Sequence, residues 1–281
     1  MSVIISHEKK LKQAIAKIKV AGPDNLHVLS DFDRTLTYAY ADGQKVPSLI
    51  AILRNGHYLS KDYAQKAHAL FDKYHPLEID PQLSLAAKKT AMNKWWRSHI
   101  KLLIKSGLNK KDLELIASDK QIRFRKGLNS FLNTLQRKNI PLVILSASGV
   151  GEAVKIYFKQ NKKNYSNIHY ITSSLVWNKA GQAIAIKEPI IHSLSKDETL
   201  IKDFPKIYQQ IKNRKNVLLL GDSLADVDMI KGFDYDNLIK IGFLNYNTPQ
   251  QKKYFLKNFD IVIEGDEDFT YINQLLKDLC K

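Results

Sequence analysis

Runs of apolar residues recur along the chain, and segments with helical spacing separate most of them. The apolar runs lie at 26–33, 140–148, 167–177, 216–223, 237–245 and 259–265. Helical patterns follow at 127–139 and 150–161, for example. Continuous apolar strands that alternate with helices are typical of a parallel sheet covered on both faces. The pattern therefore predicts an α/β fold with a parallel Rossmann-like sheet flanked by helices.

One long segment breaks this alternation. Residues 42–126 carry mainly helical patterns, at 60–75, 84–107 and 109–119. An insert of this kind, directly after the first buried strand, predicts a helical cap domain over the strand ends. We therefore expect a catalytic core formed by residues 1–41 and 127–281 and a cap formed by residues 42–126. The chain is expected to begin with an amphipathic helix, and the sequence "KAGQ" at 179–182 predicts a hairpin turn.

Composition narrows the class of protein. The 281 residues include 44 Lys and Arg against 28 Asp and Glu, a net charge of +16. The basic residues are scattered and form no known nucleic-acid-binding motif, so we expect a solvated surface that attracts small anions and binds no specific nucleic acid. No apolar stretch is long enough to span a membrane, and the start of the chain does not resemble a signal peptide. The one cysteine, Cys280, fits a cytoplasmic protein, expected to be a monomer or weak oligomer.

Two carboxylates stand at the end of the first apolar run. Asp31 and Asp33 are one residue apart, so on a strand their side chains point the same way. Two carboxylates in one pocket need a cation or must share a proton. Mg²⁺, held by carboxylates and a substrate phosphate, would meet this need. We interpret Asp31 as a nucleophile and Asp33 as a general acid and base; alternatively, Asp33 only caps the next turn.

Two further apolar runs also end in polar residues. Ser146 and Ser148 follow one of them, where a hydroxyl and the backbone amides of Ala147 and Ser148 could bind a phosphate. A simple helix N-cap would explain the same serines. Asp222 and Asp226 follow another run, after Gly221, at a spacing that can bring both near a metal held by Asp31. Because ligands bind at the carboxyl ends of parallel strands, we expect one shared site.

Together, "DFDRT", "LSAS" and "GDSLAD" resemble the motifs of the haloacid dehalogenase superfamily of phosphohydrolases. The whole chain is also similar to the cytosolic 5'-nucleotidase III family, or pyrimidine 5'-nucleotidases, in "YHPLEIDPQLSL", "IPLVILSASGVGE" and "LLLGDSLADVDM". The resemblance implies that Asp31 attacks phosphorus and that Asp33 protonates the leaving ribose oxygen and then activates water. It also implies that Mg²⁺ is held by Asp31, the backbone carbonyl of Asp33 and Asp222, with support from Asp226.

The same resemblance assigns the remaining residues of the site. Lys196 in "IIHSLSKDE" would balance the phosphate charge, with Lys187 as a less favoured rival. Glu78 matches a residue that contacts the nucleoside, and Ser98 matches a substrate-contacting serine less closely. The phosphate would be held by Ser146 and the amides of Ala147 and Ser148, and the base would lie against Trp95 and Trp96, which could equally be plain packing residues. The sequence departs from the family at Arg34, Lys94 and Ser148.

The resulting expectation is a Mg²⁺-dependent phosphatase acting on nucleoside 5'-monophosphates, with UMP and CMP preferred, through a phospho-Asp31 intermediate. Transfer of the phosphoryl group to a nucleoside is a further possibility for this family. Two alternatives remain open: another small phosphomonoester, such as 7-methylguanosine monophosphate or phosphoserine, or a basic nucleic-acid-binding protein on a phosphatase scaffold.

Overall fold

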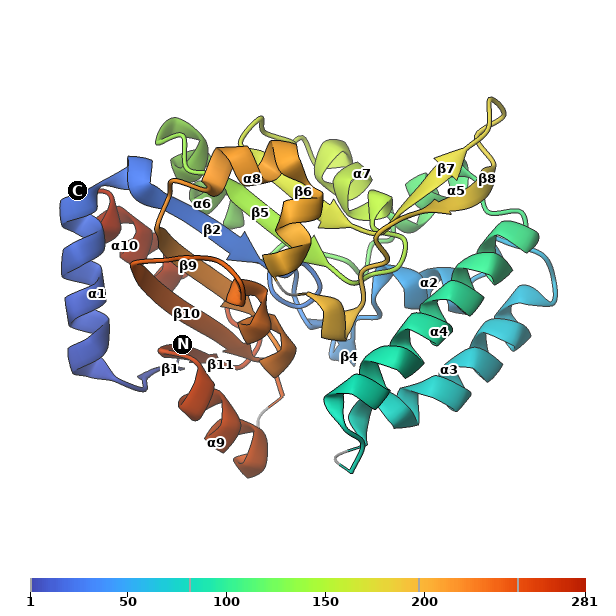
Figure 1. Ribbon diagram of the computed structural model, residues 1–281, viewed down its shortest axis with the longest axis horizontal. Coiled ribbons are helices and arrows are strands. Elements are labelled where there is room, and N and C mark those ends of the chain that lie inside the picture. Colours follow the sequence, from blue (N-terminus) through green and yellow to red (C-terminus); the bar gives the residue numbers. More distant parts are fainter. Residues whose placement is uncertain (1, 81, 197, 247) are drawn as a thin grey trace.

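A computed structural model describes residues 2–80, 82–196, 198–246 and 248–281 (Figure 1). Its centre is a seven-stranded sheet of order β1-β11-β10-β9-β2-β5-β6, parallel except for β1. The strands are β1 Ser2–Ile5, β2 Leu26–Ser30, β5 Leu142–Ser146, β6 Ile168–Thr172, β9 Asn216–Gly221, β10 Asn237–Leu244 and β11 Ile261–Glu264. The predicted α/β fold with a mostly parallel sheet is therefore confirmed.

The central strands are buried along their whole length, because helices cover both faces of the sheet. Every residue of β2, β5 and β9 is buried. Alternate side chains enter two separate cores: Val28 belongs to one, and Leu29 belongs to the other. The first face is covered by α1 Glu8–Ala21, α6 Leu128–Arg137, α7 Glu152–Gln160 and α10 Thr270–Leu279, and the second by α8 Pro205–Ile211 and α9 Pro249–Asn258.

The N-terminal prediction is confirmed in part. Helix α1 buries Leu11 and Ile18, as the amphipathic pattern indicates. Residues 2–5, however, do not belong to the helix: they form β1, which pairs antiparallel with β11 at the edge of the sheet. The run Val3-Ile4-Ile5 explains the difference, since β-branched side chains favour an extended backbone.

The segment between β2 and α6 is helical, as predicted. It contains α2 Leu49–Asn55, α3 Tyr63–Ile79, α4 Leu85–Lys105 and α5 Lys110–Ile116, after a short pair of strands, β3 Tyr40–Ala41 and β4 Gln44–Lys45. Helices α3 and α4 lie side by side beyond the carboxyl ends of the sheet strands (Figure 1). Helix α5 instead packs on α7 of the core, where Gln160 donates to the carbonyl of Glu114. The cap boundaries at 42 and 126 stay a prediction.

A hairpin extends from the sheet toward α4. Strands β7 Ser174–Trp177 and β8 Ala183–Lys187 pair antiparallel, with Gly181 in the turn at a φ of +79°. This confirms the turn predicted from "KAGQ". Four 3-10 segments complete the described chain: η1 Pro23–Asn25, η2 Ser193–Ser195, η3 Glu198–Asp203 and η4 Leu224–Ile230.

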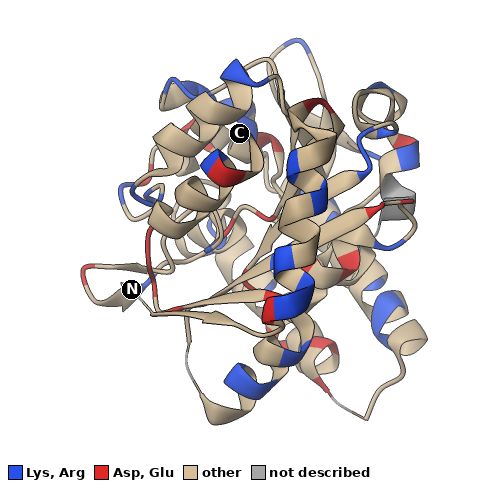
Figure 2. Cartoon of the chain, turned by 90° about the vertical axis from the view of Figure 1, so that its left-hand side faces the viewer, with Lys and Arg blue, Asp and Glu red and all other residues tan. Residues whose placement is uncertain are grey.

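Charged residues are spread over the whole molecule. Figure 2 shows Lys and Arg on helices and loops throughout the chain, with Asp and Glu interspersed. This distribution agrees with the scattered basic residues of the sequence. Within the described residues, no helix combines the length and apolar character that crossing a membrane requires.

Candidate active site

The three polar strand ends lie at one edge of the sheet. Strand β2 is hydrogen-bonded to β9 on one side and to β5 on the other, so the residues that follow these strands are neighbours. They border a cavity of about 340 Å³. Its lining includes Asp31, Asp33, Ala147, Ser148, Lys196, Asp222 and Asp226 from the core and Glu78, Trp95 and Trp96 from the helical segment. The single shared site that the sequence predicts is therefore formed.

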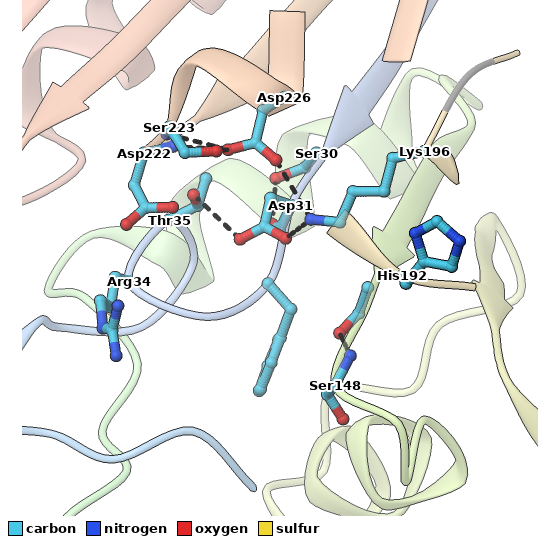
Figure 3. A network of polar contacts seen from close by, with 12 residues as sticks. Ser30, Asp31, Arg34, Thr35, Ser148, His192, Lys196, Asp222, Ser223 and Asp226 are labelled. Carbon is cyan, nitrogen blue, oxygen red and sulfur yellow. Dashed lines mark hydrogen bonds and ion pairs between the residues drawn. The ribbon is translucent and has the colours of Figure 1, made fainter. Parts of the chain in front are cut away.

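A buried lysine joins two of the carboxylates (Figure 3). Lys196 Nζ donates to Asp31 Oδ1 and, at 3.1 Å, to Asp226 Oδ1. The other oxygen of Asp31 accepts from Thr35 Oγ1 at 3.3 Å. All three charged side chains are buried, with side-chain exposures of 8% for Lys196, 6% for Asp31 and 2% for Asp226. Charges this buried are stable only when they are paired.

One ammonium group does not neutralise the acidic cluster. Burial raises the pKa of Asp31, and the neighbouring carboxylates add to this effect against the attraction of Lys196. Burial also raises the pKa of Asp222, together with repulsion from Asp226 and Asp31. For Lys196, burial alone would lower the pKa, but Asp226 and Asp31 outweigh it and raise the pKa above its ordinary value. With all of these carboxylates ionised, the site would hold more negative charge than one ammonium group balances, so it favours a bound proton or a cation.

The acidic cluster fits a divalent cation. Asp31, Asp222 and Asp226 each offer one carboxylate oxygen, and these oxygens all lie within 4.8 Å of one another. Mg²⁺ prefers such oxygen ligands and relieves carboxylate repulsion. Asp226 is largely committed, since its Oδ2 accepts from the backbone N–H groups of Asp222 and Ser223 and from the Ser223 hydroxyl at 2.8–3.1 Å. Asp226 thus holds the backbone at Asp222 and Ser223, which leaves Asp31 and Asp222 as the better direct ligands.

Gly221 makes room for Asp226. A Cβ atom at Gly221 would lie 2.5 Å from the Cβ of Asp226, closer than carbon atoms can approach. Glycine is therefore required at this position because it leaves space for the Asp226 side chain. Asp228 points outward and pairs with Lys231 at 2.7 Å.

The loop after β5 carries the predicted phosphate-binding residues. The N–H of Ser148 donates to Ser146 Oγ at 3.3 Å, and the buried Ser148 hydroxyl has no partner among the described residues. Ser146 is buried behind the loop and does not line the cavity, whereas Ala147 and Ser148 do. Of the alternative that a serine or glycine caps the helix, the serine part is wrong: α7 begins at Glu152 with a glycine, Gly151, as its N-cap.

An arginine that sequence analysis missed holds the loop after β2. Arg125 is 1% exposed and donates to the backbone carbonyls of Arg34 (2.6 Å) and Thr35 (2.9 Å). It also forms an ion pair with Asp266 at 2.9 Å. This loop carries Asp33 and includes Arg34 at a φ of +61°, a left-handed conformation that costs a non-glycine residue free energy. Arg125 therefore positions the loop without lining the cavity.

Aromatic side chains from α3 and α4 form the far wall of the cavity. Trp96 stacks between Trp95 and His99, with ring centres 5.8 Å from each. Phe71 stacks on His75 at 4.7 Å. All five line the cavity, although only the two tryptophans were expected there. Flat aromatic faces at this end suit a planar ring such as a nucleobase.

Gly149 brings this wall against the loop after β5. Its φ is +72°, and a Cβ there would lie 2.0 Å from Cζ3 of Trp96. Only glycine fits both the backbone conformation and the close approach of the indole ring. The aromatic wall and the loop after β5 are therefore in direct contact.

Glu78 links the aromatic wall to the segment that carries Lys196. One carboxylate oxygen accepts from the hydroxyl of Ser193 in η2, and the other lies 3.2 Å from Nδ1 of His75. Ser193 stands three residues before Lys196 in the chain. Glu78 is therefore held at the cavity between α3 and η2.

Three other residues of the sequence analysis lie away from the cavity. Ser98 is partly buried but does not line it; the adjacent His99 does. Lys187 is exposed at the end of β8, so Lys196 is the lysine that meets the carboxylates. Lys94 is exposed on α4. Of the departures from the family pattern, Arg34 and Ser148 line the cavity and Lys94 does not.

The fold and the site define the class of protein. A parallel sheet with Asp31, Lys196 and Asp226 at its carboxyl edge is the architecture of a haloacid dehalogenase-superfamily hydrolase. A Vibrio cholerae structure described as a probable phosphoserine phosphatase has the same fold, with a TM-score of 0.53 at 9% identity over 93% of this chain and 67% of that chain.

The profile of the pyrimidine 5'-nucleotidase (UMPH-1) family matches residues 34–280. The chain belongs to this family and is a 5'-nucleotidase, a phosphoric monoester hydrolase. It is 32% identical to the human 7-methylguanosine phosphate-specific 5'-nucleotidase, covering 100% of this chain and 93% of that protein. The fruit-fly enzyme of the same name (Drosophila melanogaster) is 29% identical over 95% of this chain and 84% of its own length. A crystal structure of cytosolic 5'-nucleotidase IIIB bound to cytidine has a TM-score of 0.89 at 27% identity, over 99% of this chain and 93% of that one.

Proposed function

We propose that this protein is a cytoplasmic, Mg²⁺-dependent 5'-nucleotidase that hydrolyses pyrimidine nucleoside monophosphates, UMP and CMP, through a phospho-Asp31 intermediate. The observation that carries the proposal is a single cavity with a charged end and an aromatic end. The Asp31–Lys196–Asp226 network lies at one end, and stacked aromatic rings with Glu78 lie at the other. A phosphate and a base joined by ribose would reach both ends.

The core residues supply the chemistry of the phosphate end. A carboxylate oxygen of Asp31 would attack phosphorus while the P–O5' bond breaks and Asp33 gives its proton to the leaving ribose oxygen. Burial raises the pKa of Asp33, which favours the protonated form that this step needs. Asp33 would then take a proton from water as the water oxygen attacks phosphorus and the bond to Asp31 breaks, releasing phosphate. A bound Mg²⁺ would neutralise phosphate charge and orient the group.

Other groups would hold the phosphate between these steps. Lys196 is fixed beside Asp31 and can balance the charge of the transferring group. Ala147 and Ser148 line the same cavity, where the Ala147 amide and the unpartnered Ser148 hydroxyl would donate to the phosphate oxygens, and the Ser148 amide would do so once it leaves Ser146 Oγ. An acceptor nucleoside bound in place of water would allow phosphoryl transfer by the same route.

The aromatic end of the cavity favours a nucleotide, rather than a smaller phosphomonoester, as the substrate. Phosphoserine has no ring to contact the aromatic wall. A cavity of about 340 Å³ accommodates a ligand of nucleotide size, and the match to the pyrimidine 5'-nucleotidase family favours a pyrimidine base. The second candidate is 7-methylguanosine monophosphate, since relatives carry that specificity in their names and a cationic base binds well to aromatic faces.

Phosphate release from UMP, CMP, AMP, GMP, 7-methyl-GMP and phosphoserine tests the proposal. We expect the highest kcat/KM for UMP and CMP with Mg²⁺ and loss of turnover with EDTA. Asp31→Asn removes the nucleophile and should lower kcat by at least about three orders of magnitude. The matched control is Asp228→Asn, which changes an outward-facing carboxylate of the same acidic stretch and should leave kcat unchanged.

Each alternative has its own outcome in this experiment. Highest activity on 7-methyl-GMP or phosphoserine would overturn the pyrimidine assignment and keep the phosphatase. Turnover in Asp31→Asn at the wild-type rate would overturn the covalent intermediate. Unchanged turnover in EDTA would overturn the metal dependence.

A further inference from the structure

Two arginines, Arg34 and Arg54, line the cavity, and Arg54 lies at the end that carries the aromatic side chains. Arg54, in α2, lines the cavity together with Phe71 and His75 of α3. Its guanidinium carbon lies 4.4 Å from the centre of the Phe71 ring, so the planar group stacks on that ring. Arg54 therefore belongs to the same wall as the aromatic side chains proposed to contact the base.

The charge of Arg54 is not neutralised by a neighbour. Its Nε is buried without a hydrogen-bond partner, and no ion pair joins it to a carboxylate, in the part of the chain that the structure describes. Burial lowers the pKa of Arg54, against the smaller opposing effects of Tyr63 and of Asp72, an exposed residue of α3. Because Nε is itself inaccessible, the terminal NH₂ groups of this half-buried guanidinium are the donors that a ligand in the cavity would meet.

Glu78 supplies a fixed negative charge at this end, and each of its oxygens can accept a further hydrogen bond. Glu78 accepts from Ser193 and lies 3.2 Å from His75 Nδ1. The base end thus presents a donor-only cation, Arg54, and an acceptor-only carboxylate, Glu78. An uncharged base that carries both acceptor atoms and N–H groups, as cytosine, uracil and guanine do, matches this pair of charges.

We propose that Arg54 is a specificity-determining residue that selects an uncharged base with acceptor atoms and disfavours the cationic base 7-methylguanine. The inference rests on the proposed function, because it places the base against this wall. Methylation of guanine at N7 removes an acceptor that arginine binds and adds a positive charge to the ring. Both changes weaken binding beside an uncompensated guanidinium, since like charges in contact are costly.

The test compares CMP, GMP and 7-methyl-GMP in wild type, Arg54→Met and Arg54→Lys. The readout is the ratio of kcat/KM for 7-methyl-GMP to that for CMP, measured on one preparation so that losses of folded protein cancel. We expect Arg54→Met to raise this ratio at least about tenfold, mainly through a lower KM for 7-methyl-GMP. Arg54→Lys keeps the charge and should shift the ratio far less.

A matched control separates contact from overall charge. Lys94→Met removes one positive charge from α4 at an exposed site outside the cavity, and it should leave the ratio unchanged. An unchanged ratio in Arg54→Met, or an equal shift in Lys94→Met, would overturn the inference about Arg54. The order of the three substrates in wild type tests the pyrimidine assignment separately. A wild type that prefers 7-methyl-GMP would overturn that assignment whatever Arg54→Met does.

Discussion

His27 in β2 makes the stability of the fold depend on pH. The ring is fully buried, with Nδ1 donating to the carbonyl of Arg214 at 2.8 Å and Nε2 without a partner among the described residues. Burial lowers the pKa of His27 to about 4. Above its unfolded pKa of about 6.5 the side chain is neutral in both states. As the pH falls from there to about 4, only the unfolded chain gains a proton, so stability is lost, by up to about 3 kcal/mol.

Urea unfolding at pH 7.5, 6 and 5 would measure this effect. We expect His27→Asn, whose amide can replace the Nδ1 donor, to be less stable at pH 7.5 but to lose less stability than wild type as the pH falls. His99 has its pKa lowered to about 4, also by burial, and its contribution remains in both proteins. Equal pH slopes for wild type and His27→Asn would show that His27 does not titrate as proposed.

Residues with a motif could be found from the sequence, and residues without one could not. Asp31, Asp222 and Lys196 were predicted and lie together. Arg54 and Arg125 carry no signal, because a lone arginine is usually a solvated side chain. His99 could have been preferred to Ser98: the buried positions of α4 are Met92, Trp95, Trp96, His99, Ile100 and Leu103, and this helical spacing excludes position 98.

Arg125 holds the loop after β2 in place from outside that loop. Arg125 bonds to the carbonyls of Arg34 and Thr35, and its partner Asp266 accepts from the N–H groups of Ala39 and Tyr40 at 2.8 Å. Arg125→Met would leave these buried acceptors without a donor. We expect a loss of about 3–5 kcal/mol in unfolding free energy and a lower kcat for UMP, because the loop carries Asp33.

Chemical denaturation and single-turnover kinetics would check this prediction. Arg125→Lys restores the charge without the planar fork, so it should recover stability only in part. The matched control is Arg123→Met, which breaks the exposed ion pair with Asp42 at 2.9 Å and should cost less than about 1 kcal/mol. Equal effects of Arg123→Met and Arg125→Met would contradict a positioning role for Arg125.

Elements were predictable where local pattern and tertiary environment agree. Strands β2, β5 and β9 are apolar throughout and buried on both faces, so the continuous runs predicted them. The edge strand β1 is four residues long, and its pairing with β11 is a contact that local sequence does not encode. The order of strands in the sheet likewise depends on long-range pairing, and the shared site at its edge was inferred from a general rule about parallel sheets.

The net charge of +16 bears on how the whole molecule meets its substrate. Lys and Arg are spread over the chain (Figure 2), while Lys196, Arg34 and Arg54 line the cavity itself. A long-range positive field of this kind attracts a dianionic nucleotide, and salt screens it. We expect kcat/KM for UMP to fall several-fold between about 20 mM and 300 mM NaCl, through KM, with kcat unchanged.

Inhibition by cytidine provides the control for this prediction, because cytidine would occupy the same cavity without a phosphate charge. Its inhibition constant should not change over the same range of salt. If salt weakened the binding of cytidine and of UMP equally, salt would be altering the site itself, and the steering argument would fail.

A gel shift with DNA or RNA that disappears steeply with salt would instead revive the nucleic-acid-binding alternative. The scattered arrangement of the charges argues against that outcome, since a nucleic-acid footprint requires a continuous basic surface, whereas attraction of a small dianion requires only the summed field and cations at the cavity.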